Sequence, residues 1–191
     1  GTKMKLSKII IATLLVTLSG ISNAVEQGYI GASFSKIYYQ ESDVLVPNGS
    51  PISVPDAKFS SLNLLGGLSI SDKLSSEFRF GFGLDTDTLN LLDNKIDLDQ
   101  KWYVGGYVKY AGTTINGFTP YGLIGYTRGR IDAKNESLDD VVSVYESDLS
   151  FGLGVEYLSN SDNSFNLEFI NLLDTGNVTI NAFTIGFKDF F

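Results

Sequence analysis

Apolar and polar residues alternate with a period of two along one stretch of the chain. Between Glu77 and Leu84 the apolar positions are Phe78, Phe80, Phe82 and Leu84, and the positions between them carry Arg79, Gly81 and Gly83. Because successive side chains of an extended backbone leave opposite faces, this spacing predicts a β-strand. The second face is small and sparsely charged. This is typical of a strand whose apolar side meets lipid and whose other side lines a narrow barrel.

The same alternation marks seven further segments. The eight predicted strands are Gly28–Tyr39, Phe59–Ile70, Ser75–Leu84, Lys101–Ala111, Thr119–Arg130, Leu149–Leu158, Ser164–Leu173 and Val178–Phe191. Each is about as long as a tilted membrane crossing requires, roughly 9–11 residues. Alternation alone does not say which face points inward.

The connections between the predicted strands differ in length. Three long connections cover residues 40–57, 85–99 and 131–147, whereas the connections at 71–75, 112–117 and 159–163 are short and rich in turn formers. Long loops at one end and tight turns at the other are typical of outer-membrane barrels. The pattern therefore predicts an all-β fold, an eight-stranded antiparallel up-and-down transmembrane β-barrel.

The first residues have the composition of an export signal. A basic start around Lys5 is followed by the apolar run 9–18 and then by small residues. The apolar run is shorter than the roughly 20 residues that a membrane-spanning helix needs. The predicted division is an N-terminal extension and signal peptide over residues 1–24, cleaved between Ala24 and Val25, and a barrel over residues 25–191.

Composition and charge exclude several classes of function. The chain has no histidine and no cysteine, so a Ser-His-Asp arrangement and a thiolate zinc site are both impossible. The formal charge of −8 falls to −11 once the three lysines of residues 1–24 are removed, and such a protein repels nucleic acid. We expect no enzymatic activity, no cofactor, no metal and no nucleic-acid partner.

At several places the chain resembles the small bacterial outer-membrane β-barrel family, meaning the OmpA-type transmembrane domain and its OmpX-like relatives. The resemblance rests on Gly28-Tyr29-Ile30-Gly31, the strand from Glu77 to Leu84, the run Thr119 to Tyr126, Gly154-Val155-Glu156-Tyr157 and the final strand. It implies export through the inner membrane to the bacterial outer membrane and periplasmic termini. It also implies a barrel assembly machinery that reads an insertion signal at Gly186, Phe187 and Phe191.

Seven charged residues fall on the predicted polar faces of the strands. They are Glu77, Arg79, Lys109, Arg128, Glu156, Glu168 and Lys188. An eight-stranded barrel is just wide enough for side chains to fill, and buried charges persist when they are paired. We predict that the seven form an ion-pair network that plugs the lumen. The alternative is a narrow polar channel for small solutes.

The long connections are rich in carboxylates. Five lie within residues 85–99 (Asp85, Asp87, Asp93, Asp97 and Asp99) and five within residues 131–147 (Asp132, Glu136, Asp139, Asp140 and Glu146). Their spacing lacks the alternating ligands and turn glycine of a calcium loop, so we expect a solvated surface.

Function on a rigid scaffold is commonly carried by loops. We hypothesise a structural or surface-interaction role, adhesion or host contact, for a monomer. Its partners are outer-membrane lipid, lipopolysaccharide and a host or surface ligand bound by the three long connections. A soluble, lipocalin-like carrier, with the aromatic face inside, remains a second alternative.

Overall fold

The computed structural model describes residues 27–42, 44–45, 51–52, 56–91, 94–135, 140–160, 162–176 and 178–191. The predicted signal peptide, with its cleavage site at Ala24 and Val25, lies outside these residues. The strands are β1 (Gln27–Glu41), β2 (Val44–Leu45), β3 (Pro51–Ile52), β4 (Ala57–Ser69), β5 (Leu74–Gly83), β6 (Thr86–Leu91), β7 (Asn94–Ala111), β8 (Phe118–Asn135), β9 (Asp140–Leu158), β10 (Asn163–Asp174) and β11 (Val178–Phe190). Among the described residues, no helix is long and apolar enough to span a membrane.

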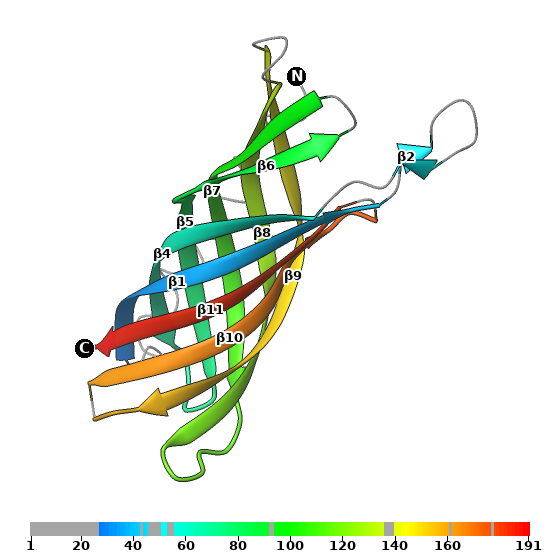
Figure 1. The fold of residues 1–191 in the computed structure, drawn as a ribbon. Helices are drawn as coiled ribbons and strands as arrows, with labels where there is room; N and C mark the ends of the chain where they lie inside the picture. Colours follow the sequence, from blue (N-terminus) through cyan, green and yellow to red (C-terminus); the bar gives the residue numbers. More distant parts are fainter. Residues whose placement is uncertain are drawn as a thin grey trace, which may run out of the picture.

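Eight of these strands close into a barrel (Figure 1). The first strand pairs with the last, with Gly31 opposite Lys188, and β5 pairs with both β4 and β7. All pairings are antiparallel, and neighbours in the sequence are neighbours around the wall. The predicted fold class, an eight-stranded antiparallel barrel, is confirmed.

The two ends of the barrel differ. The short connections 70–73, 112–117 and 159–162 lie at the end where β1 begins and β11 ends, which we call the turn end. At the opposite end, the hairpin end, β6 pairs with β7 and β8 pairs with β9 as strand hairpins (Figure 1).

The prediction that residues 85–99 and 131–147 are loops is wrong. Thr86 pairs with Asp99 and Leu91 with Asn94, and the β8–β9 ladder continues until Asn135 faces Asp140. The apolar–polar alternation fades along these segments although the hydrogen-bonded ladder continues. A period-two pattern marks only strands with one apolar face.

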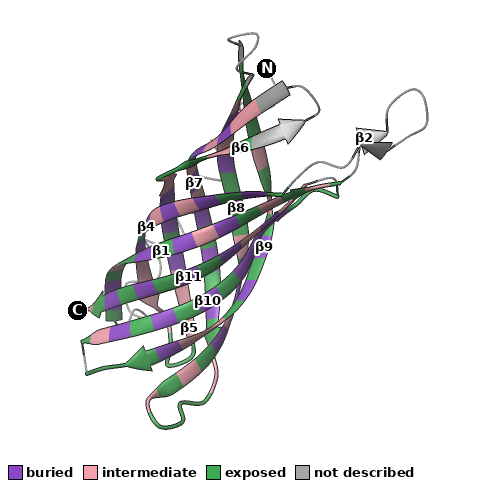
Figure 2. Cartoon of the chain, viewed as in Figure 1, coloured by how far each residue is buried: buried purple, intermediate pink, exposed green. Residues whose placement is uncertain are grey.

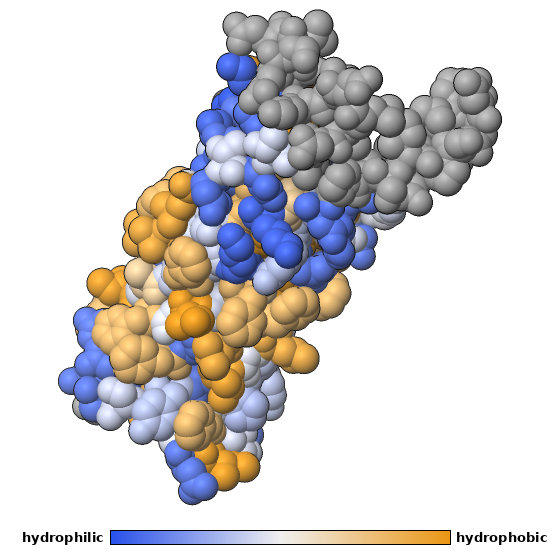
Figure 3. All heavy atoms as spheres, viewed as in Figure 1, coloured by the Kyte–Doolittle hydropathy of each residue, from blue (hydrophilic) through white to orange (hydrophobic). Residues whose placement is uncertain are grey.

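The apolar face of the strands points outward. Phe78 and Leu84 are 56% and 54% exposed, and Figure 2 shows buried and exposed residues alternating along the strands. The space-filling view shows orange, apolar atoms gathered around the body of the barrel and blue, hydrophilic atoms above them (Figure 3). This orientation contradicts the lipocalin-like alternative, in which the aromatic face would be the interior.

Candidate functional site

The interior of the barrel holds most of the charged residues singled out from the sequence. Glycines on the inner face leave space for the large aromatic rings that cross the lumen. A Cβ at Gly81 would overlap the ring of Tyr103, and one at Gly154 would overlap the ring of Tyr121. At these two positions glycine is thus required by close packing and not by backbone conformation.

Arg79 lies at the centre of the charged interior. Its Nε donates to Glu77 Oε1 at 2.5 Å, while Nη1 and Nη2 donate to the two carboxylate oxygens of Glu168 at 2.5 and 2.8 Å. The side chains of all three residues are at most 5% exposed. A planar guanidinium that engages one carboxylate with two parallel hydrogen bonds is held in a fixed orientation.

Two lysines complete the network. Lys188 Nζ donates to Glu77 Oε2 at 2.9 Å and lies 4.0 Å from Glu156 Oε1, and Lys109 forms an ion pair with Glu156. These residues come from strands that are far apart in the sequence but face one another across the lumen. Together with Arg79 and Glu168, the network holds three cations and three carboxylates, so its formal charge is zero.

Tyrosines surround this network, although the sequence prediction did not include them. Tyr29 donates to Glu77 Oε2 and Tyr121 to Glu168 Oε2, both at 2.9 Å. The guanidinium carbon of Arg79 lies 4.9 Å from the centroid of the Tyr107 ring. For Tyr29 and Tyr107 the available signal is their position on the same face as Gly31 and Gly105, whereas Tyr121 lies on the face predicted to meet lipid. Amphipathic rings supply both hydrogen bonds and cation–π contacts to buried charges.

A layer of hydroxyls and amides lies next to the charged network. Asn63 Nδ2 donates to Ser33 and Ser35 at 3.0 and 2.7 Å, and its Oδ1 accepts from Tyr103 at 2.8 Å. Uncharged polar groups buried in this way are costly unless they are hydrogen-bonded, and these are.

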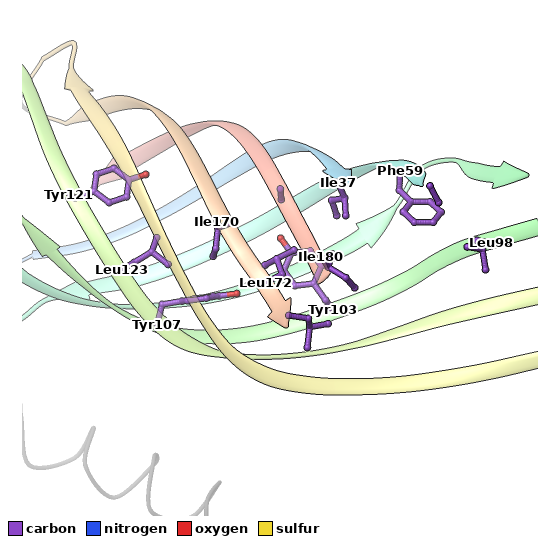
Figure 4. Packing of buried hydrophobic residues seen from close by; sticks show 13 residues of the cluster. Ile37, Phe59, Leu98, Tyr103, Tyr107, Tyr121, Leu123, Ile170, Leu172 and Ile180 are labelled. Atoms are coloured by element: carbon purple, nitrogen blue, oxygen red, sulfur yellow. The ribbon is translucent and has the colours of Figure 1, made fainter. Parts of the chain in front are cut away.

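An apolar cluster extends from the tyrosines around the charged network toward the hairpin end of the lumen (Figure 4). Ile37 and Phe59 are 1% exposed, and a bulge in β10 lets consecutive residues, Leu172 and Leu173, both be buried there. The cavity that remains among these side chains has a volume of about 30 Å³. A space of this size admits only a few water molecules.

A wider opening lies at the turn end of the described barrel. A cup of about 190 Å³ there is lined by Tyr29, Ser75, Lys109, Thr119 and Glu156, among others. Its floor is the charged network itself. Within the described ranges, no group of three or more His, Cys, Asp or Glu residues is placed to hold a metal ion.

Comparison with known proteins identifies the family of this barrel. The model of the outer membrane protein beta-barrel domain family matches residues 10–188. The chain belongs to this family. No curated protein matches the sequence.

Solved outer-membrane barrels share the fold at low sequence identity. The Ail protein of Yersinia pestis, in complex with the heparin analogue sucrose octasulfate, has a TM-score of 0.60 at 13% identity, covering 86% of this chain and 98% of Ail. Neisserial surface protein A has a TM-score of 0.58 at 15% identity, covering 85% and 96%. OprG of Pseudomonas aeruginosa has a TM-score of 0.56 at 15% identity, covering 90% and 98%.

One residue of the outer-membrane barrel lies on the other side of the wall from its predicted place. Arg128 was expected in the lumen, but it is exposed on the outer face of β8, where the inward positions are Thr127 and Gly129. The prediction for Arg128 is wrong because it requires Tyr121 and Leu123, which have the opposite parity in the same strand, to face the lipid. Both are buried in the lumen, at 4% and 5% exposure, so the parity of the whole strand was reversed.

The three residues of the predicted insertion signal lie on the last strand and at the end of the chain. Gly186 faces the interior beside Asn166, whereas Phe187 and Phe191 are 40% and 73% exposed on the outer side. The backbone of Phe191 pairs with that of Gly28 through two hydrogen bonds of 2.9 and 3.1 Å, which anchors the end of the chain to the first strand.

Proposed function

We propose that the protein is a surface-interaction barrel of the bacterial outer membrane, with a lumen that braces the wall and a hairpin end that binds a partner outside the cell. The turn end and both chain termini face the periplasm in this proposal. Short turns on the periplasmic side and longer extracellular extensions are the common arrangement in this class of barrel.

The filled lumen is the observation that carries the proposal. The charged residues at its core are mutually neutralised, and the apolar cluster next to them leaves a cavity of only about 30 Å³. A hydrated solute could pass only if both layers came apart. This packing supports a structural lumen over a channel.

The hairpin end carries the charge available for recognition. The three segments that hold it, residues 40–57, 85–99 and 131–147, contain three, five and five acidic residues, against two basic residues, Lys95 and Lys134. Three of these carboxylates form ion pairs with cations just outside the segments, Asp85 with Lys36, Asp99 with Lys101 and Asp132 with Arg130, and the remaining excess is still acidic. A surface of this sign attracts cationic partners and repels polyanions. We therefore propose a basic protein surface as the partner class. The heparin analogue bound by Ail is of the opposite sign.

Whole cells that display the barrel test this proposal. Replacing residues 87–98 by a two-residue Asn-Gly turn removes the β6–β7 hairpin and leaves β5 and β7 free to continue pairing. Binding of fluorescent poly-lysine, and of a basic matrix protein, is expected to fall at least about threefold, since the segment carries three carboxylates and each exposed ion pair contributes roughly 0.2–1 kcal/mol.

A matched control lies at the turn end, where Asp72→Asn and Asp162→Asn remove exposed carboxylates from the opposite side of the membrane. Heat-modifiable gel mobility verifies that every variant still forms a barrel. Undiminished binding by a folded hairpin variant, or equal loss in the control, would contradict the proposal.

A further inference from the structure

Arg128 is a free cation on the outer wall of the barrel. It is exposed on β8, between Val104 of β7 and Ser147 of β9. It makes no side-chain hydrogen bond or ion pair with any residue in the part of the chain that the structure describes. An arginine that does not serve the lumen and has no partner on the wall requires another explanation.

The position of Arg128 is the boundary of the apolar band. On the same face, toward the turn end, follow Tyr126 and Ile124, which are 53% and 59% exposed. Toward the hairpin end, the next row holds Trp102 and Tyr145, whose ring centroids are 6.4 Å apart. Aromatic girdles of this kind sit at the level of the lipid headgroups.

The neighbouring cations are already neutralised. Arg130 donates to both carboxylate oxygens of Asp132 at 2.8 and 2.9 Å, and Lys101 forms an ion pair with Asp99. Three cations and two carboxylates leave this patch with a formal charge of +1, which is the charge of Arg128. The whole protein has a net charge of −8, so the positive charge at Arg128 is confined to this patch. A confined positive charge favours binding of an anion there.

The nearest carboxylates on β9 do not reach Arg128. Glu146 lines the small cavity inside the barrel. Asp148 accepts hydrogen bonds from the backbone N–H groups of Leu149 and Asp174. Neither therefore offers Arg128 a partner on the outer face.

Hydroxyl groups stand beside the guanidinium. Ser147 is the cross-strand neighbour of Arg128, and the Tyr126 hydroxyl donates to Ser147 Oγ at 3.0 Å. Ser147 accepts this bond and keeps its own proton to donate, so a guanidinium fork with one hydroxyl donor beside it matches the oxygens of a phosphate group. The exposed apolar surface of Ile124 and Leu149 directly below suits an acyl chain attached to that phosphate.

We propose that Arg128, with the hydroxyl of Ser147 that Tyr126 holds in place, binds the phosphate of a phosphorylated lipid headgroup in the outer leaflet. The leaflet follows from the orientation proposed above, whereas the binding itself does not depend on it. A membrane lipid is favoured over a free phosphate ion, because its acyl chains can pack on the continuous apolar surface beneath the cation. The methylene groups of the arginine side chain lie on the same surface.

The full barrel in phosphatidylcholine nanodiscs provides the test. Increasing amounts of lipid A, which carries phosphate monoesters, are added, and bound lipid is counted by native mass spectrometry. Trp102 is the one tryptophan of the chain and lies in the row next to Arg128, so its emission reports the same site. Arg128→Gln is expected to weaken lipid A binding about fivefold, the effect of one basic residue near the surface.

Lys73→Gln is the matched control, because it removes one exposed cation from the turn end. It is expected to leave binding unchanged. Three results would overturn the proposal: equal lipid A affinity in Arg128→Gln, equal binding of dephosphorylated lipid A, or displacement of lipid A by millimolar inorganic phosphate. The nanodisc assay is indifferent to which end faces outward, so its failure is distinct from failure of the hairpin-partner proposal.

Discussion

Replacing Arg79 by methionine removes the central cation of the lumen while nearly preserving side-chain volume. In the wild-type protein this guanidinium donates three hydrogen bonds, one to Glu77 and two to Glu168. Both carboxylates are buried, so the consequence depends on what each of them retains.

The two carboxylates are left in different situations. Glu77 keeps the ammonium of Lys188 and the hydroxyl of Tyr29, each at 2.9 Å. Glu168 keeps the hydroxyl of Tyr121 as its hydrogen-bond donor among the described residues. Breaking a buried ion pair by removing one partner costs about 3–5 kcal/mol. Arg79→Met is therefore expected to lower the free energy of unfolding by about 3–5 kcal/mol, because it leaves the charge of Glu168 without a cation.

A second variant separates charge from packing. Glu168→Gln combined with Arg79→Met removes both members of the pair, so the network returns to neutrality. The double variant is expected to recover at least about 2 kcal/mol of the loss, since a neutral pair of similar volume commonly replaces a buried ion pair at little cost.

Urea unfolding in lipid vesicles, followed by the emission of Trp102, measures the free energy of unfolding of each variant. Lys73→Gln, an exposed substitution at the turn end, is expected to remain within about 0.5 kcal/mol of wild type. If Arg79→Met cost less than about 1 kcal/mol, the lumen would have to be hydrated enough to solvate Glu168, and the idea of a packed electrostatic brace would fail.

Three further changes probe the wall, the packing and the hairpin end. Phe80→Arg places a cation on the lipid face near the middle of β5 and is expected to cost about 2–4 kcal/mol in the vesicle unfolding assay; a cost near zero would mean that this face does not meet lipid. Gly81→Leu drives a side chain into the ring of Tyr103 and is expected to cost at least about 1–3 kcal/mol by the same measurement, whereas an unchanged midpoint would contradict the close approach. Asp85 is exposed, and the slight loss of solvent around its carboxylate raises its pKa, but hydrogen bonds from Ser60 and the charge of Lys36 outweigh this and hold the pKa below its usual 3.8. The ionised Asp85 carboxylate therefore stabilises the folded state above pH 3.8, and this stabilisation is lost as the pH falls through the lower pKa of the folded protein. Asp85→Asn should make the melting temperature less dependent on pH across that acidic range. An unchanged pH dependence would contradict this assignment.

The strands and their inward faces were largely predictable from the sequence, because a wall with lipid on one side imposes a period of two. The segment from Glu77 to Leu84 shows this, since its phenylalanines face outward and Glu77 and Arg79 face inward. The rule failed at β8, where Tyr121 and Leu123 face the lumen. A ring or an aliphatic side chain satisfies either environment, so parity there depends on partners across the barrel.

Pairings across the lumen could not be predicted. Arg79 and Glu168 are 89 positions apart and meet only once the barrel closes. The hairpins at the far end were also missed, because strands that project beyond the apolar band lose the one-sided hydrophobicity that reveals a strand in sequence. The sequence pattern thus predicted the strands of the wall. The contacts inside the lumen could not be predicted, because they exist only once the barrel has closed.

Single-protein conductance across a planar bilayer tests the central claim most directly. A lumen filled by a neutral ion-pair network and an apolar cluster predicts no persistent open events above the background of the bare membrane, at either polarity. Arg79→Met combined with Phe59→Ala, which thins both layers, is the positive comparison and is expected to admit ions. Sustained, voltage-independent current through the wild-type barrel would contradict the account and favour a solute channel.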